Sequence, residues 1–149
     1  MMLSENATRL YAAFFEELGL CKSGGLPDVR IYSRKGARIL TGILLADGIT
    51  LGRSIYVHPR FISRDASGRL VISKNLLAHE LVHVIQYSNQ GIRRFLTSYI
   101  SYFWREFRER KKWNARTWYE AYLLIPHEIE ARETAAKFGP WLESRDSSY

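Results

Sequence analysis

The sequence predicts an α+β domain, in which an N-terminal helix and a small antiparallel sheet precede a helix that carries two histidines and two to three C-terminal helices. Three observations support this fold class. Apolar side chains recur at helical spacing near both ends of the chain. Short runs rich in Ile, Val and Leu, typical of strands, lie between them. Strands grouped together, and not alternating with helices, are typical of α+β proteins. We expect the 149 residues, 1–149, to form a single domain.

The N-terminal half is predicted to hold one helix and all the strands. Residues 5–18 place apolar side chains at helical spacing, and Gly19 follows as a helix stop. We expect a loop at 22–28 and a turn at 65–68. Strands are predicted at 29–33, 37–46, 49–58 and 69–73. Asp47-Gly48 is a strong two-residue hairpin signal, and it predicts that the second and third strands pair.

The C-terminal half is predicted to be helical. Residues 92–110 carry one apolar stripe of helical period, which we expect to be core and not a ligand-binding surface. A further short helix is predicted at 113–124. Pro126 is expected to begin the last helix and Gly139-Pro140 to end it, because proline suits the first helical turn and glycine the position after the last.

The segment AHELVHVIQ, residues 78–86, is the most informative motif in the chain. His79 and His83 stand four residues apart, so a helix places both on one face, about one turn apart. Glu80 lies about 100° round the helix axis, where it can flank a shared metal ion without binding it. The surrounding residues are apolar, which predicts a buried helix whose polar groups must be paired or bind metal. The motif predicts His79 and His83 as metal ligands and Glu80 as a general base.

These three residues resemble the HExxH motif of zincin metallopeptidases. Gln86 and Asn89 stand where a metzincin would continue with Gly and His, so the pattern is not that of a metzincin. A gluzincin is instead completed by a Glu from a later helix. The segment IPHEIEARETAAKF, residues 125–138, is similar to that helix, with Glu128 followed three residues later by Ala131.

The resemblance extends over about residues 36–138 and includes short bacterial minigluzincin-like domains, in which an ITLG-type strand also precedes the metal helix. It implies a minimal zincin-like fold, one Zn²⁺ per chain, and Glu128 as the third ligand. Arg132 departs from the pattern, because several gluzincins have an Asp there that orients the histidines. The group that orients them must therefore come from elsewhere.

Three acids of the last predicted helix compete for the role of third ligand. Counting about 100° per residue from Pro126 places Glu128 on the small, apolar side of the helix. Glu130 and Glu133 fall on the opposite side, which has the character of a solvated face. We therefore predict Glu128, with His127 as the reserve candidate. An acid in the first helical turn that is stabilised by the helix dipole is the alternative interpretation of Glu128.

The function expected from these residues is a zinc-dependent metallohydrolase, foremost a peptidase acting on a peptide or protein with zinc-activated water and Glu80 as general base. Tyr119, Tyr122 and His127 are all candidates for stabilising the developing oxyanion. The strand at 52–58 is a candidate edge strand for holding an extended peptide, and an ordinary paired strand is an equally good interpretation. A zinc-binding regulatory or interaction module with little turnover is the alternative, and hydrolysis of an ester or side-chain amide is a third.

The chain is basic, with a net charge of +7 that is concentrated in one segment. Residues 93–112 hold seven Arg or Lys side chains against two Glu, a local charge of +5. We interpret this segment as a solvated helix face that makes weak electrostatic contact with anionic lipid or nucleic acid. Cys21 is the single cysteine, so no intramolecular disulfide forms. We see no signal peptide or apolar run of membrane-spanning length, and expect a cytoplasmic protein.

Overall fold

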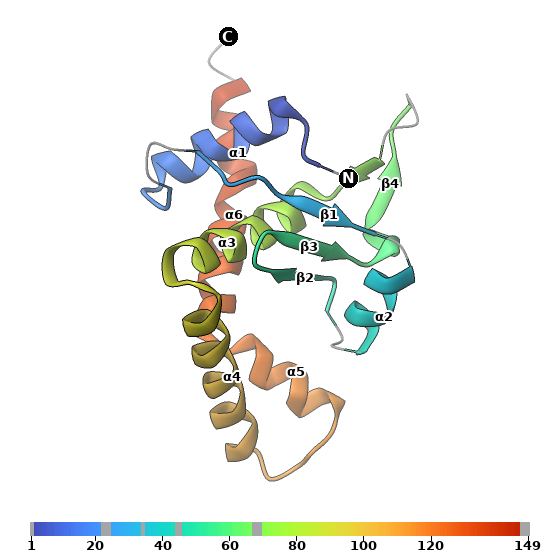
Figure 1. Ribbon diagram of the computed structural model, residues 1–149, viewed down its shortest axis with the longest axis vertical. Helices are drawn as coiled ribbons and strands as arrows, with labels where there is room; N and C mark the ends of the chain where they lie inside the picture. The colour runs from blue at the N-terminus through green and yellow to red at the C-terminus, as the bar shows by residue number, and fades with distance from the viewer. Residues whose placement is uncertain (1, 22–24, 34, 44–45, 67–69, 147–149) are drawn as a thin grey trace.

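The computed structural model describes residues 2–21, 25–33, 35–43, 46–66 and 70–146 and has the predicted α+β architecture (Figure 1). The elements are, in chain order, α1 (Glu5–Glu17), β1 (Arg30–Tyr32), α2 (Lys35–Ile43), β2 (Gly48–Leu51), β3 (Ser54–Val57), η1 (Pro59–Phe61), β4 (Ile62–Arg64), β5 (Leu70–Ile72), α3 (Lys74–Gln90), α4 (Ile92–Glu109), α5 (Ala115–Leu123) and α6 (Pro126–Asp146). The predicted histidine helix is α3, and three helices follow it.

The sheet in front of α3 is mixed and not purely antiparallel as expected. Its strand order is β1-β3-β2, with β1 parallel to β3 and β2 antiparallel to it. β4 and β5 form a separate antiparallel pair. The single strand predicted at 49–58 is in fact two strands, joined by a turn in which Gly52 has a φ of +61°. Glycine adopts a positive φ without steric strain, and the chain reverses at Gly52. The hairpin predicted at Asp47-Gly48 is therefore wrong.

The strand predicted at 37–46 is also wrong, because the described part of this segment belongs to helix α2. Ala37 and Thr41, one helical turn apart, are both buried. The Thr41 hydroxyl donates to the Ala37 carbonyl at 2.8 Å, a bond available only in a helix. The run of Ile and Leu suggested a strand, but its buried positions follow the helical period. Residues 44–45, within the predicted strand, lie outside the described residues, as do 22–24 of the predicted loop and 67–68 of the predicted turn.

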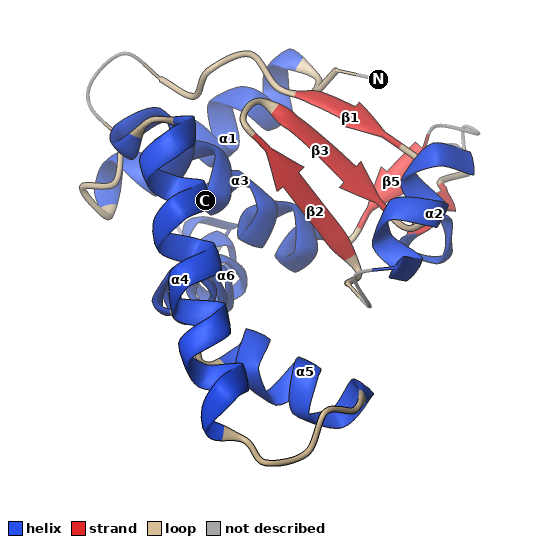
Figure 2. Ribbon diagram, turned by 60° about the horizontal axis from the view of Figure 1, so that its bottom comes forward, coloured by secondary structure: helices blue, strands red, loops and turns tan. Residues whose placement is uncertain are grey.

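Helix α3 lies at the centre of the molecule, with the sheet on one side and α1 and α6 on another (Figure 2). Its apolar side chains are buried nearly all round the helix, as the sequence predicted. An aromatic cluster ties the terminal helices to this core. Phe14 of α1 meets Phe138 of α6 at 5.0 Å between ring centroids, and Tyr11 stacks on Phe138 at 4.5 Å. Burial of each such ring stabilises the fold by about 1.5–3 kcal/mol. Because these rings belong to the same core cluster as the apolar side chains of α3, they hold α6 against α3.

Helix α6 does not end at Gly139-Pro140 as predicted, but continues through Pro140 to Asp146. The residues after the proline have tertiary partners that hold them in the helix. Trp141 packs on the main core and donates its indole N–H to the Glu17 carboxylate at 2.8 Å. Arg145 donates to the same carboxylate at 3.0 Å. These contacts with α1 offset the backbone hydrogen bond that Pro140 cannot make.

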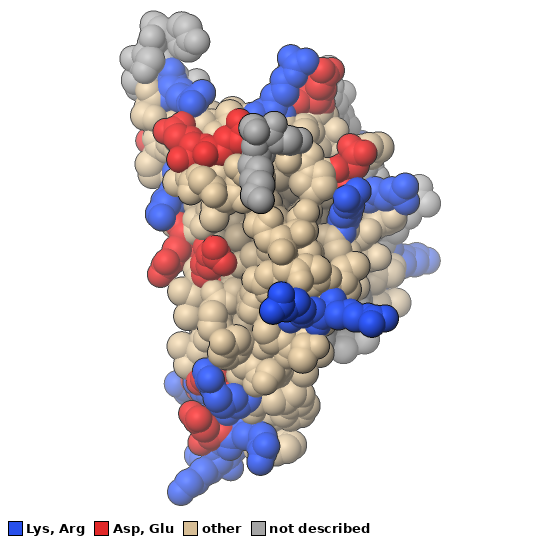
Figure 3. All heavy atoms as spheres, turned by 60° about the vertical axis from the view of Figure 1, so that its left-hand side comes forward, with Lys and Arg blue, Asp and Glu red and all other residues tan. Residues whose placement is uncertain are grey.

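Helices α4 and α5 form a hairpin that projects from the rest of the molecule (Figure 1). Phe103 and Phe107 of α4 pack with Ala121 of α5 and Ile125 in a second, smaller core. The basic side chains of α4 that we expected to be exposed are exposed: Arg93, Arg94, Arg105 and Arg108. Figure 3 shows Lys and Arg side chains gathered at the end of the hairpin, with acidic side chains among them. Among the described residues, no helix is long and apolar enough to cross a membrane.

We predict that the basic face of α4 binds anionic vesicles and duplex DNA only weakly, because Arg105 and Arg110 already pair with Glu106. Binding measured by co-sedimentation and gel shift should disappear as salt rises from about 0.05 to about 0.5 M, where exposed charges are screened. Reversing Arg105 and Arg108 to Glu should abolish it, whereas the same reversal of Lys35 and Arg38 on α2 should reduce it less. Tight binding that persists at high salt would contradict this interpretation.

Candidate metal centre

Helix α3 places His79 and His83 together, as their spacing predicted. Their rings meet edge to face at 4.8 Å between centroids, and their Nε2 atoms lie 3.2 Å apart. His83 is buried, and the His79 side chain is only 14% exposed. The two nitrogens are therefore directed to one point on the side of α3 that faces α6.

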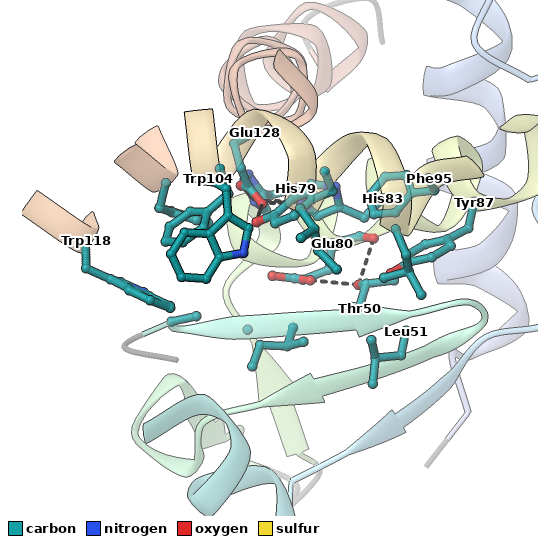
Figure 4. A pocket seen from close by; sticks show the side chains of 18 residues that line it. Thr50, Leu51, His79, Glu80, His83, Tyr87, Phe95, Trp104, Trp118 and Glu128 are labelled. Atoms are coloured by element: carbon teal, nitrogen blue, oxygen red, sulfur yellow. Dashed lines mark hydrogen bonds and ion pairs between the residues drawn. The ribbon is translucent and has the colours of Figure 1, made fainter. Parts of the chain in front are cut away.

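Glu128, from the first turn of α6, meets both histidines at that point (Figure 4). Its Oε2 lies 3.1 Å from His79 Nε2 and its Oε1 lies 3.2 Å from His83 Nε2. One donor atom from each of the three residues lies within 4.8 Å of the others, close enough for all three to share one cation. Ala131, one turn further along α6, is fully buried, and its small side chain allows α6 to approach α3 closely.

The donor set fits a metal ion, and zinc in particular. Two imidazoles and one carboxylate with a position left open are a common zinc-binding set in hydrolases. Glu128 is buried, and both of its oxygens face the Nε2 atoms of the histidines. A buried carboxylate is costly unless a cation or a hydrogen-bond donor meets it. The three donors are thus suited to hold a zinc ion.

The electrostatics of the cluster favour a positive charge at its centre. Burial would raise the pKa of Glu128, but the charge of His83 and hydrogen bonds from both histidines hold that pKa well below its usual range. Burial would lower the pKa of His83, but the Glu128 carboxylate outweighs it and raises this pKa to about 9. Glu128 is therefore ionised at neutral pH and available to a cation.

The other residues considered as third ligand lie elsewhere. Glu130 and Glu133 are exposed, as predicted. Thr134, on the same helix, is buried. His127 is buried, but its Nε2 faces Ser98 at 3.4 Å and Gln90 at 3.3 Å, away from the cluster. His127 therefore takes no part in the cluster.

Gln86 orients His83, a role that the sequence analysis did not assign. Its Oε1 lies 2.8 Å from His83 Nδ1, so it accepts the Nδ1 proton and directs Nε2 toward the cluster. The Gln86 amide in turn donates to Glu130 at 2.8 Å and to the His127 carbonyl at 3.2 Å. Gln86 thus fixes the orientation of the His83 ring. The sequence feature that could have indicated this role is a polar residue three positions after His83, on an otherwise apolar helix face.

Glu80 lies between the cluster and strand β2, and is only 2% exposed. Its Oε2 accepts a hydrogen bond from the Thr50 hydroxyl at 2.7 Å. Burial raises the pKa of Glu80, against the lowering effect of the two histidines and Thr50. Gly48 leaves the space that the carboxylate fills, because a Cβ there would lie 2.4 Å from Glu80 Oε1. Strand β2 is therefore shaped to hold this carboxylate beside the cluster of His79, His83 and Glu128.

Two tyrosines lie at the site, and one of them was not predicted. Tyr122 is directed toward Glu128, and burial together with that carboxylate raises its pKa, so its phenol keeps its proton. Tyr119 is half exposed and stacks on Tyr122 outside the site. The residue missed is Tyr99, whose phenol donates to Glu128 Oε1 at 2.6 Å. A tyrosine within the apolar stripe of α4 signals a buried hydroxyl that needs a partner.

The cluster opens into a pocket of about 420 Å³ between β2 and the α4–α5 hairpin. The apolar stripe predicted for α4 consequently has a buried part and a half-exposed part. Phe95, Phe103 and Phe107 are buried as expected. Ile100 is half exposed and lines the pocket together with Leu96. The expectation that this stripe is core and not a ligand-binding surface is therefore wrong for its pocket side.

We predict that Gly48→Ala destabilises the protein, because the new methyl group displaces the Glu80 carboxylate and breaks its bond with Thr50. The expected loss in the free energy of unfolding is about 1–3 kcal/mol, the usual cost of overpacking. Gly42→Ala is the matched control, since Gly42 lies in α2 with no atom within 4 Å of its added Cβ. Helix propensity should make that variant more stable by about 0.5–1 kcal/mol. Urea unfolding distinguishes the two, and equal effects would contradict the tight packing at Gly48.

Comparison with known families gives one match. Residues 21–91 match the family model of the eCIS core domain, and this range is just under half of the chain. It includes the sheet, His79, Glu80 and His83, and it ends before Glu128. Comparison with curated proteins and with solved structures gives no match.

Proposed function

We propose that this protein is a zinc-dependent metallohydrolase that cleaves peptide bonds. His79, His83 and Glu128 hold the zinc ion, and Glu80 is the general base. The observation that supports this most strongly is the meeting of three potential metal-binding donors from two helices beside a second buried acid, Glu80. The resemblance of the motif to the gluzincin pattern points the same way.

Glu80 moves the proton in the proposed reaction. Zinc, when bound, supplies Lewis acidity to the scissile carbonyl and to the attacking water. Glu80 takes the proton of that water at a carboxylate oxygen and passes it to the leaving amine. Thr50 keeps the carboxylate in place through its hydrogen bond to Oε2.

Tyr122 is the proposed donor to the developing oxyanion. It lines the pocket and retains its phenolic proton, whereas Tyr119 is not at the pocket. His127 is turned toward Ser98 and Gln90. A donor directed at the site where negative charge develops stabilises the transition state more than the ground state.

Strand β2 is the proposed edge for an extended substrate. Residues 52–58 were a candidate for this role, with an ordinary paired strand as the equal alternative, and β3 is indeed paired on both sides in the middle of the sheet. β2 pairs with β3 alone among the described strands and lines the pocket beside Glu80. An added peptide strand would therefore run along β2 past the metal ligands.

A zinc-binding interaction module with little turnover is the second candidate. The exposed basic face of α4 favours it, because such a face can contact an acidic partner. Against it stands Glu80, since a purely structural zinc site has no use for a buried acid held beside its ligands. Hydrolysis of an ester or a side-chain amide would use the same residues.

We predict about one zinc per chain, measured by mass spectrometry of the purified protein. His79→Ala and Glu128→Ala should lose it on dialysis against a mild chelator, because two remaining ligands hold zinc poorly. Glu133→Ala should keep it, since Glu133 is exposed on α6. Glu130→Ala would be a poor control, because Glu130 accepts a hydrogen bond from Gln86. Full zinc content in His79→Ala would remove the basis of the proposal.

We further predict that Glu80→Gln lowers peptide hydrolysis by about 100-fold or more, the usual scale for loss of a general base. Gln preserves the size of the side chain, so the variant should retain its zinc. Cleavage of a peptide library by wild type and variant measures the effect. Glu133→Gln serves as the matched control and should cleave at the wild-type rate. Equal rates for Glu80→Gln and wild type would exclude Glu80 as the base.

A further inference from the structure

The pocket beside His79, His83 and Glu128 has two apolar walls. Helix α4 forms one with Leu96, Ile100 and Trp104, which stand at intervals of four and share one face. Strand β2 forms the opposite wall with Ile49 and Leu51. The metal ligands and Glu80 lie between these walls, so any group bound between them sits next to the reacting bond.

The α4–α5 hairpin makes one end of the pocket aromatic and rigid. Trp118 of α5 lines this end and packs on Phe103 at 4.4 Å and on Phe107 at 5.6 Å between ring centroids. Trp104 packs on the same two rings at 5.8 Å each. Because Phe103 and Phe107 are buried, the two indoles are held in place before any ligand arrives.

The exposed fractions and the charges of the lining residues indicate which kind of side chain this pocket binds. Leu51 is 45%, Ile100 50% and Trp104 43% exposed, an uncovered apolar surface of the kind that marks binding sites. No Lys or Arg is among the described lining residues, and Glu80 and Glu128 are the only acids there. A charged substrate side chain would lose its water without gaining a partner, whereas a large apolar one would displace water from both walls.

We infer that the substrate carries a large aromatic or branched apolar side chain next to the scissile bond, and that Trp104 and Trp118 select it. This inference rests on the proposed function, because it assigns the pocket to the substrate of the same site. With a volume of about 420 Å³, the pocket has room for such a side chain and adjacent backbone. A small side chain would leave the two walls uncovered.

Binding of two peptide hydroxamates to the zinc-loaded protein tests the inference without requiring turnover. The compounds differ in one side chain, which is benzyl in the first and methyl in the second. Calorimetry should show that the benzyl compound binds at least about tenfold more tightly, as expected for several extra carbons in an apolar pocket. Trp104→Ala should bring the two affinities together. Trp113→Ala, a matched change on the same hairpin outside the pocket lining, should leave the preference unchanged.

A second variant keeps the test informative if Trp104→Ala folds poorly, which circular dichroism would show. Ile100→Trp fills the pocket from an exposed position and should remove the benzyl preference while the methyl compound still binds. Equal affinities in wild type, no binding of either compound, or a preference unaffected by both pocket variants would overturn the inference. A clear benzyl preference in a protein that cleaves no peptide with a large apolar side chain would instead refute the peptidase and leave the pocket assignment standing.

Discussion

The close packing of α3 against α6 is the constraint on which the candidate site depends. Glu128 reaches the two histidines only because these helices approach each other closely, and small buried residues on both, Ala78 and Ala131, allow that approach. The aromatic contacts between Phe14 and Phe138 hold α6 in position from its far end. A core that fixes the relative position of two helices thereby fixes the distances among three donor atoms.

Each buried polar group of the site has a support from a different part of the fold. Gln86 of α3 fixes His83, Thr50 of β2 holds Glu80, and Tyr99 of α4 donates to Glu128. Such groups would destabilise an apolar core if they were left unpaired. Their partners offset the cost of burying them and hold the side chains in fixed positions. Glu128 is buried with both of its oxygens facing the two histidines, which is where a bound cation would lie.

The α4–α5 hairpin serves two purposes at once. Its inner rings form a small core of their own, which keeps the hairpin folded where it projects from the main core. Its opposite face stays partly uncovered and forms one wall of the pocket with Ile100 and Trp104. This division explains why Ile100 and Trp104 of α4 remain partly exposed.

The local parts of the structure could be predicted from the sequence by itself. Helix α3 and the shared face of His79 and His83 follow from spacing along one helix, which depends only on neighbouring residues. The choice of Glu128 over Glu130 and Glu133 followed from the small, apolar side of one helix, and the structure brings Glu128 to the two histidines.

Only the tertiary structure decided the rest. The segment at 35–43 is compatible with strand or helix, and the burial of Ala37 and Thr41 against the sheet made it helical. The edge position of β2, and with it the setting of Glu80, depends on strand order, which no local pattern contains. The contacts of Thr50 with Glu80, Tyr99 with Glu128 and Gln86 with Glu130 join residues 30, 29 and 44 positions apart. Periodicity shows which face of an element is buried, but the partner on that face is determined by how the whole chain packs.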